Sequence, residues 1–319
     1  HIGHVAVNTS VGKLRVGLDL ELVDAAGAGR VHVVAEMLDE QGHVEKRFEK
    51  AAPIRRESIQ RVRVTWDWPD PRLWAVGDPN LYTLQLHVKG AGIDDVYATR
   101  FGFREFRVEG RGYTLNGVPF KPRTIQAGLP LRELSMQRNL DEMQRLGFNL
   151  MEVWPSDHWN QRGNAGTNAD WFDEADRRGL AITGVMPHVG WAGSRYKNPE
   201  QREAFRHWAE QAWRKYGNHP SLVMWGSSGN AMGSRLDPDL IGRRRPARQA
   251  QLAETQRDWR PAIEALDSAY RVIKDIDPTR PVFFHNCGPQ GDVYTANFYM
   301  NLIPLQERED WVSDYVQHG

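Results

Sequence analysis

The sequence contains a single cysteine, Cys287, among 319 residues. One cysteine excludes an internal disulfide framework and a zinc site built from thiolates, so packing has to stabilise the fold. Hydrophobic residues make up 40% of the chain, which is enough for a sizeable core. The lack of disulfides leaves the compartment open, because many secreted proteins have none.

The sequence also lacks a net charge and a long apolar run. Lys and Arg total 41, as do Asp and Glu, so no broad attraction to nucleic acid or to acidic lipid is expected. No run approaches the roughly 18 apolar residues of a membrane span, and no signal-peptide pattern is present, so we expect a soluble protein. Because the chain opens with His1, we expect a mature or excised piece of a longer protein. The sequence leaves the compartment and the oligomeric state open.

The first hundred residues have the pattern of β-strands. Residues 14–22 alternate apolar and polar side chains, which is typical of a strand with one buried face. Similar segments are residues 31–34, 59–64 and 81–88, and turn-forming residues separate them. This spacing predicts an immunoglobulin-like β-sandwich over residues 1–104.

From residue 105 onward, short apolar runs alternate with longer helical segments. The predicted strands are residues 148–154, 180–186, 222–225, 281–284 and 293–299. The predicted helices are residues 135–146, 170–178, 199–216 and 254–275. Strands that alternate with helices indicate βαβ units and a parallel sheet. We therefore predict a multidomain protein of β plus α/β class, in which residues 105–319 form about six of the eight strands of a (β/α)₈ TIM barrel.

Three segments carry a family resemblance. Residues 71–84 read PRLWAVGDPNLYTL, residues 101–123 read FGFREFRVEGRGYTLNGVPFKPR, and residues 219–233 read HPSLVMWGSSGNAMG. In this order they resemble glycoside hydrolase family 2, the family of β-galactosidases, β-glucuronidases and β-mannosidases. The resemblance covers almost the whole chain. It implies a retaining β-glycosidase whose site lies at the carboxyl ends of the barrel strands.

Two departures from the family pattern affect the predicted chemistry. The family has a general acid/base Glu after Gly-Asn, and here Gly229-Asn230 is followed by Ala231. The family nucleophile is a second Glu on the seventh strand, and we expect this chain to stop just before that strand. Glu307 and Glu309 are tempting substitutes for it, but their charged surroundings favour the start of a helix.

The origin of Ala231 has three explanations at this point. Ala231 can be an engineered Glu→Ala change, or a natural residue of a family member that has lost hydrolysis. The third explanation is that the chain is a fragment of a longer enzyme. The last explanation is compatible with either of the others. The intact residues around position 231 favour an engineered change.

The resemblance also implies roles for three polar residues. Asn230 corresponds to an Asn that hydrogen-bonds the sugar hydroxyl next to the reacting carbon. Tyr299 corresponds to a Tyr that bonds the nucleophile, with a simple packing role as the alternative. Arg123 resembles an Arg at the end of the first barrel strand.

Further candidates follow other predicted strands. His188, His285 and Asn286 follow the third and fifth strands and are expected to line the pocket, where His and Asn can hydrogen-bond sugar hydroxyls. Each also has the alternative of a purely local hydrogen bond. Trp154 can stack on a sugar face. Trp191 and Trp225 are similar candidates, although Trp225 also fits a core position.

The sequence contains no cluster of Glu, His and Asp with metal-ligand spacing, so we predict no required metal and no cofactor. The expected partner is a β-glycoside, with β-galactosides slightly favoured, and the sequence does not decide the sugar. The alternative function is a non-catalytic carbohydrate-binding or scaffold protein on the same fold. Residues 242–251 are basic and are predicted to be a solvated loop, with contact to a phosphate or an acidic partner as the alternative. Zero net charge makes nucleic-acid binding by this loop a weak hypothesis, and no nucleic acid or membrane partner is predicted.

Overall fold

The computed structural model describes residues 1–25, 27, 29–127, 135–154, 168–190, 193–227, 231, 260–295, 309 and 313. The described residues belong to two compact units. The first takes its residues from 1–185, 210–225 and 279–281, and the second takes its residues from 186–209, 226–278 and 282–319.

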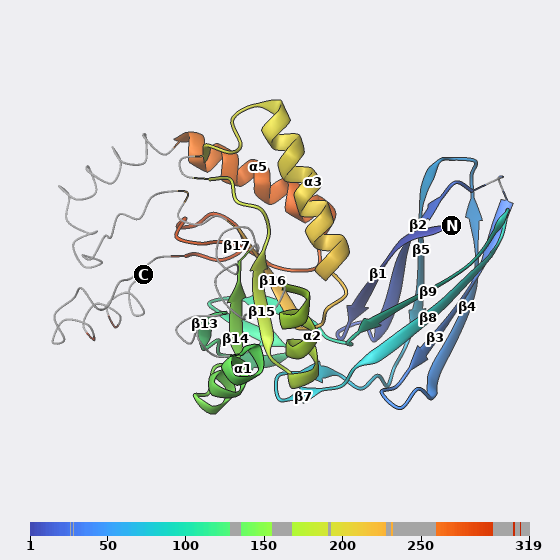
Figure 1. Ribbon diagram of the computed structural model, residues 1–319, viewed down its shortest axis with the longest axis horizontal. Coiled ribbons are helices and arrows are strands. Elements are labelled where there is room, and N and C mark those ends of the chain that lie inside the picture. Colours follow the sequence, from blue (N-terminus) through green and yellow to red (C-terminus); the bar gives the residue numbers. More distant parts are fainter. Residues whose placement is uncertain are drawn as a thin grey trace. The chain divides into compact units, whose positions relative to one another are not determined.

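The amino-terminal part of the first unit contains two antiparallel sheets (Figure 1). One has the strand order β1-β2-β5, with β1 at Ile2–Ser10, β2 at Arg15–Val23 and β5 at Ile59–Asp67. The other has the order β4-β3-β8-β9, with β4 at Val44–Ile54, β3 at Gly29–Leu38, β8 at Tyr82–Gly90 and β9 at Ile93–Phe101. The predicted β-sandwich is confirmed.

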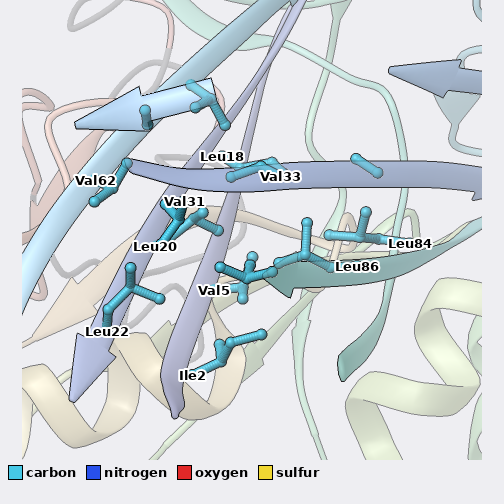
Figure 2. Packing of buried hydrophobic residues seen from close by; sticks show 14 of the residues in the cluster. Ile2, Val5, Leu18, Leu20, Leu22, Val31, Val33, Val62, Leu84 and Leu86 are labelled. Carbon is cyan, nitrogen blue, oxygen red and sulfur yellow. The ribbon is translucent and has the colours of Figure 1, made fainter. Parts of the chain in front are cut away.

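Alternating side chains of the two sheets form the sandwich core. Leu18 and Leu20 of β2 and Val31 and Val33 of β3 are fully buried, and Figure 2 shows them packed together. Their neighbours in sequence point outward, as the period of two along a strand requires. Burying an aliphatic side chain of this size contributes about 1.5–3 kcal/mol, so this core can hold the sheets together without a disulfide.

Sequence reasoning missed strand β4. This strand lies at the edge of its sheet and pairs only with β3 among the described strands. Its residues read VEKRFEKAAPI, and most of their side chains are exposed. An edge strand with charged side chains is protected from aggregation, but it lacks the hydrophobic alternation by which a strand is identified.

A short antiparallel sheet follows the sandwich. It consists of β10 (Phe106–Glu109), β11 (Gly112–Leu115) and β12 (Val118–Phe120). Leu115 pairs with Val118, so Asn116 and Gly117 form a two-residue turn. Their φ angles are 55° and 77°, as a type I′ turn requires.

The α/β region contains a five-stranded sheet in the order β13-β14-β15-β16-β17. These strands are Thr124–Gln126, Leu150–Val153, Ala181–Val185, Leu222–Ser227 and Val282–Phe284. Helices α1 (Met136–Arg145), α2 (Asn168–Arg178), α3 (Pro199–Tyr216) and α5 (Arg260–Ile276) alternate with them. β14 pairs in parallel with β13 and with β15, which confirms the predicted parallel α/β region.

Local sequence signals define helix α1. The Ser135 side chain accepts a hydrogen bond from the Arg138 N–H, which caps the amino end of the helix. Gly147 has a φ of 79° after the carboxyl end, a conformation that favours glycine. The buried residues Met136, Leu140 and Met143 form the predicted apolar face.

The strand predicted at residues 293–299 is described only at its start. Residues 293–295 form no regular strand, and Thr295 takes part in an isolated bridge to Gly288. Residues 296–299, which include Tyr299, lie outside the described residues, so the rest of this strand stays a prediction.

The segment between the sandwich and the short sheet is fixed by close packing within the first unit. A Cβ on Gly102 would lie 2.7 Å from the Pro220 Cβ and 2.8 Å from the Trp74 Cβ. Only glycine fits there. On either side of it, Phe101 and Phe103 are buried in the sandwich core. Phe-Gly-Phe-Arg is thus a structural motif of the junction.

Within the part of the chain that the structure describes, no helix combines the length and the apolar character of a membrane span.

Candidate functional site at the strand carboxyl ends

In the first unit, the parallel register aligns polar residues near the ends of three strands. Gln126 of β13 pairs with Glu152 of β14, and Glu152 pairs with Thr183 of β15. The Ala127 N–H donates to the Glu152 carbonyl oxygen at 2.9 Å, which continues the ladder beyond β13. Trp154 follows directly after β14 and is 9% exposed. Its ring is therefore mostly enclosed by neighbouring groups.

In the second unit, hydrogen bonds join the segments around the ends of β15, β16 and β17. The Met186 N–H donates to the Gly226 carbonyl oxygen at 3.0 Å. The Ser227 hydroxyl donates to the Pro187 carbonyl oxygen at 2.5 Å, and the His285 N–H donates to the Ser227 carbonyl oxygen at 3.0 Å. Ser227 is thus bonded both to the segment that carries His188 and to His285. The structure brings these two histidine-bearing segments together on one edge.

A short turn presents His285 and Asn286. Asn286 has a φ of 56°, in the left-handed region that Asn tolerates better than most residues. Thr295 fixes the turn, because its Oγ1 accepts from the Cys287 N–H at 2.9 Å and donates to the Phe284 carbonyl oxygen at 2.5 Å. Both predicted residues are partly buried, so their polar groups lie on a firmly held turn.

Backbone strain marks the end of β15. Val185 has a φ of 61°, and for a β-branched residue this conformation is unfavourable. Val185 is 4% exposed, so the surrounding packing holds it there. Such strain costs about 1–3 kcal/mol and is concentrated at functional sites in proteins. The strained residue lies three positions before His188.

Ala231 follows β16 in the sequence and is fully buried, with no exposed surface. From the sequence, we predict this position to be that of the general acid/base. A methyl group has no titratable proton, so this residue cannot protonate a leaving oxygen. A carboxyl placed here would be buried, and burial raises the pKa of a carboxyl into the range useful to a general acid.

Comparison with known proteins identifies the family. Residues 1–104 match the profile described as glycosyl hydrolases family 2, and residues 105–318 match its TIM barrel domain. The chain belongs to glycosyl hydrolases family 2.

Individual relatives of this family 2 chain are distant in sequence. It is 24% identical over 260 residues to a β-galactosidase of Thermoanaerobacterium thermosulfurigenes, which covers 76% of this chain and 30% of the relative. It is also 24% identical over 292 residues to β-galactosidase 2 of Enterobacter cloacae, which covers 86% of this chain and 22% of the relative. The chain thus spans less than a third of the length of these two relatives.

A solved structure supports the fold. The crystal structure of Parabacteroides merdae β-glucuronidase has a TM-score of 0.61 and 17% sequence identity. The match covers 93% of this chain and 35% of the glucuronidase. At this identity, the likeness supports the shared architecture and not a shared substrate.

The structure places Arg123 away from the predicted position. Arg123 precedes β13 and does not end that strand, and its backbone N–H donates to the Asn149 Oδ1 at 2.7 Å. Its exposed side chain donates to the Gly147 carbonyl oxygen at the end of helix α1. The prediction that Arg123 ends the first barrel strand is therefore wrong. These two hydrogen bonds fix Arg123 at the amino end of β13 instead.

Trp225 is a core residue. It is fully buried within β16, and the Arg280 guanidinium lies over its ring with 5.6 Å from Cζ to the ring centroid. The stacking role considered for it does not fit this position. Asn230, Tyr299 and Trp191 lie outside the described residues, as do residues 242–251 and Glu307. Glu309 is described and is exposed.

Sequence reasoning missed a polar cluster in the first unit. The Asp176 carboxylate interacts with the His219 Nδ1 at 2.6 Å and accepts from the Ser221 N–H at 3.0 Å. Arg100 pairs with Asp173, and its Nη2 lies 3.7 Å from the Asp176 Oδ2. Asp173, Asp176 and His219 have the donor types of a metal site, and their ligand atoms lie within 4.8 Å of one another. The Arg100 cation already neutralises part of their charge.

This cluster leaves little signal in the sequence, because its members are far apart along the chain. The Asp-x-x-Asp spacing of Asp173 and Asp176 places both carboxylates on one face of α2, which is a weak sign of a shared partner. Nothing in the local sequence pairs them with Arg100, 73 residues earlier. Only the docking of β9 against α2 brings the charges together.

Proposed function

We propose that this chain carries the sugar-binding face of a retaining β-glycosidase for terminal β-linked sugars, with β-galactosides slightly favoured. We further propose that Ala231 leaves the chain unable to hydrolyse them. The observation that carries the proposal is that Ala231, our predicted acid/base position, is fully buried in a chain whose residues 105–318 match the family 2 TIM barrel domain.

The proposed reaction is a double displacement. A carboxylate nucleophile attacks the anomeric carbon, while a second carboxylic acid donates its proton to the leaving oxygen. The resulting glycosyl-enzyme ester is then hydrolysed by a water molecule that the second residue, now a carboxylate, deprotonates. General acid/base help of this kind typically contributes about 10²–10⁴-fold to the rate. Ala231 supplies neither the proton nor the base.

In this proposal, residues around the carboxyl ends of the strands bind the sugar. His188, His285 and Asn286 would hydrogen-bond hydroxyl groups, because imidazole and amide groups can both donate and accept. Trp154 would stack on an apolar sugar face. Asn230 is proposed to bind the hydroxyl next to the reacting carbon and Tyr299 to bond the nucleophile. The hydrogen bonds from Ser227 to Pro187 and from His285 to Ser227 support the placement of two of these segments.

The alternative is a non-catalytic carbohydrate-binding or scaffold protein on the same fold. The observation that favours it is the same alanine, because a natural methyl group at position 231 is compatible with binding and incompatible with proton transfer. The two candidate functions predict different results when a carboxyl is restored at position 231: hydrolysis for the glycosidase, and no hydrolysis for the binding protein.

The test compares the chain as it stands, the Ala231→Glu variant, and Ala231→Glu in a chain extended by the seventh and eighth family strands. Aryl β-galactoside, β-mannoside and β-glucuronide serve as substrates. We expect turnover only from the extended Ala231→Glu protein, because acid and nucleophile act as a unit. Ala231→Gln in the extended chain is the matched control, since it fills the same volume without a titratable proton.

Two outcomes contradict the proposal. Turnover by the unmodified chain would show that the catalytic pair lies elsewhere. Absence of turnover from the extended Ala231→Glu protein on every substrate, combined with retained sugar binding in calorimetry, would favour the non-catalytic alternative.

A further inference from the structure

A polar cavity of about 240 Å³ lies in the first unit. Its walls are residues of β1 and the turn after it, the segment from Phe101 to Arg107, the turn before β16, and the pair Thr279 and Arg280. A cavity of this size is smaller than the 300–1,000 Å³ typical of pockets for drug-sized ligands. It has room for a small ion with a few waters.

Two buried guanidinium groups converge in the cavity wall. Arg104 Nη2 donates to the Leu222 carbonyl oxygen at 2.5 Å, and Arg280 Nε donates to the same oxygen at 2.7 Å. The two side chains belong to residues that are 8% and 7% exposed. Because both groups are permanently charged and share one acceptor, their mutual repulsion is only weakly screened by water.

Carbonyl groups offset part of this charge. Arg104 Nε also donates to the Pro220 carbonyl oxygen at 3.0 Å, and Arg280 Nη2 donates to the Gly217 carbonyl oxygen at 2.6 Å. Gly217 directly follows helix α3, where the helix dipole places partial negative charge. These carbonyl oxygens hold the two guanidinium groups in fixed positions, and both groups keep their positive charge.

The remaining charges of the cavity wall are also mainly positive. Of the described residues that line the cavity, Lys13, Arg104, Arg107 and Arg280 are cationic, and Glu105 alone is anionic. Glu105 accepts from the Gly12 N–H at 2.8 Å and pairs with Arg107. Burial acts against ionisation of Glu105, but these hydrogen bonds prevail and lower its pKa, so Glu105 is a carboxylate at neutral pH.

We propose that this cavity binds a small tetrahedral oxyanion, with inorganic phosphate and sulfate as the ligand class. Several permanent positive charges around a small polar cavity are what such an ion requires, and guanidinium groups match its oxygen geometry. The bound anion would link the sandwich strand β1, the junction segment and the turn before β16. This site is independent of the glycosidase proposal, because it uses none of the residues assigned to sugar binding.

The experiment titrates sodium phosphate into the full chain and follows binding by calorimetry and thermal unfolding. Sodium chloride at equal ionic strength is the reference. We expect saturable binding and an unfolding midpoint that rises with the logarithm of phosphate concentration above the dissociation constant. Sulfate should compete with phosphate. Glucose 6-phosphate distinguishes the source: binding as tight as that of phosphate assigns the site to a phosphorylated sugar, and much weaker binding assigns it to the free ion.

Two variants with opposite expected signs separate an anion site from a structural role. Because substitution of Arg104 or Arg280 removes hydrogen bonds from buried carbonyls and can prevent folding, the test uses the exposed Arg107. Arg107→Gln should weaken phosphate binding by about tenfold, and Glu105→Gln should tighten it by a similar factor. Arg15→Gln is the matched control, since Arg15 is exposed, pairs with Asp67 and lies outside the cavity.

The proposal is overturned if phosphate gives no saturable binding beyond the effect of chloride. It is equally overturned if Arg107→Gln, Glu105→Gln and Arg15→Gln bind phosphate with the same affinity. Neither result bears on the glycosidase assay, so the two proposals fail separately.

Discussion

The amino and carboxyl ends of β16 differ in how their polar groups are held. Before the strand, side chains from distant segments fix the backbone. Arg104 and Arg280 both donate to the carbonyl oxygen of the first strand residue, Leu222, and Asp176 accepts from the N–H of Ser221 in the turn before it. After the strand, hydrogen bonds from Ser227 and His285 link neighbouring strand ends. The described contacts at the amino end come from charged side chains, whereas those at the carboxyl end come from a hydroxyl group and from backbone groups.

This difference explains which part of the fold the family motifs belong to. The Phe-Gly-Phe-Arg and His-Pro-Ser segments lie at the amino end, where Gly102 packs on Pro220 and Arg104 bonds to its carbonyl oxygen. Their presence is required by the junction between sandwich and barrel. A chain can keep both motifs and still lose its acid/base residue, because the chemistry belongs to the other end of the strand. The predictions below test this division.

The largest expected effect is at the amino end of β16. Asp176 has a side chain that is 1% exposed and interacts with His219, the Ser221 N–H and Arg100. Asp176→Ala removes the partner of the His219 ring and of the Ser221 N–H, while Arg100 keeps Asp173. Breaking a buried ion pair costs about 3–5 kcal/mol. We expect the free energy of unfolding, measured by urea denaturation, to fall by about this amount.

Asp173→Ala is the control for this prediction. Asp173 also pairs with Arg100, but its side chain is 44% exposed. Exposed pairs contribute less than about 1 kcal/mol. Similar losses for the two alanine variants would contradict the view that burial makes Asp176 the centre of the cluster.

The next effect concerns the junction backbone. Gly102→Ala would place a Cβ within 2.8 Å of atoms of Pro220 and Trp74, and overpacking of this kind costs about 1–3 kcal/mol. Gly12→Ala is the control, because its nearest neighbour would be the Arg107 Nη2 at 3.6 Å, an ordinary contact. We expect a lower urea midpoint for the first variant and an unchanged one for the second. Equal urea midpoints for the two variants would show that the chain around Gly102 can move away from Pro220 and Trp74 without a loss of free energy of unfolding.

Much of the fold could be predicted from sequence because local patterns encode it. The period-two alternation at residues 14–22 identified β2, and the apolar face of Met136, Leu140 and Met143 identified α1. Strand β4 was missed because an exposed edge strand carries no such pattern. Residues 293–295 do not form the start of the strand predicted at 293–299, because Thr295 pairs with Gly288 and that pairing depends on tertiary context.

The candidate site was less predictable. Trp154 and His285 directly follow strands, as predicted, because strand ends can be located from sequence, and their role in sugar binding stays a prediction. Arg123 was misplaced by a short distance along the chain, which is enough to exchange the two ends of a three-residue strand. Interactions of large sequence separation, such as Arg100 with Asp173, leave no local signal.

A pH effect should follow from the contact between β1 and α3. His4 packs edge-on against Trp213 with ring centroids 4.8 Å apart. Burial, reinforced by the Arg214 cation, lowers the pKa of His4 from 6.5 to about 4. Since the folded pKa is the lower one, the unfolded chain binds more protons between these values. Stability should therefore fall as the pH falls from 6.5 to 4, by on the order of 2 kcal/mol.

Other groups also titrate in this range, so the measurement is a difference between variants. His4→Gln should flatten the stability profile between pH 6.5 and 4, compared with the unmodified chain, in urea denaturation at each pH. His32→Gln is the control, because the His32 side chain is 53% exposed. A profile that His32→Gln changes as much as His4→Gln would assign the effect to charge in general and not to burial at this contact.

The smallest effect compares two buried serines at the two ends of β16. The Ser227 hydroxyl donates to the Pro187 carbonyl oxygen at 2.5 Å, whereas the Ser221 Oγ is buried and has no hydrogen-bond partner among the described residues. Removing a hydrogen-bonded hydroxyl costs about 1 kcal/mol, and removing an unsatisfied one costs nothing or is stabilising. We therefore expect Ser227→Ala to lower the free energy of unfolding by about 1 kcal/mol, and Ser221→Ala to leave it unchanged or raise it.

Both variants delete the same atom from a fully buried residue, so differences in hydrophobic burial cancel. If Ser221→Ala were the more damaging variant in urea denaturation, the amino end of the strand would depend on its small hydroxyl as well as on its charges, and the contrast between the two ends would not hold.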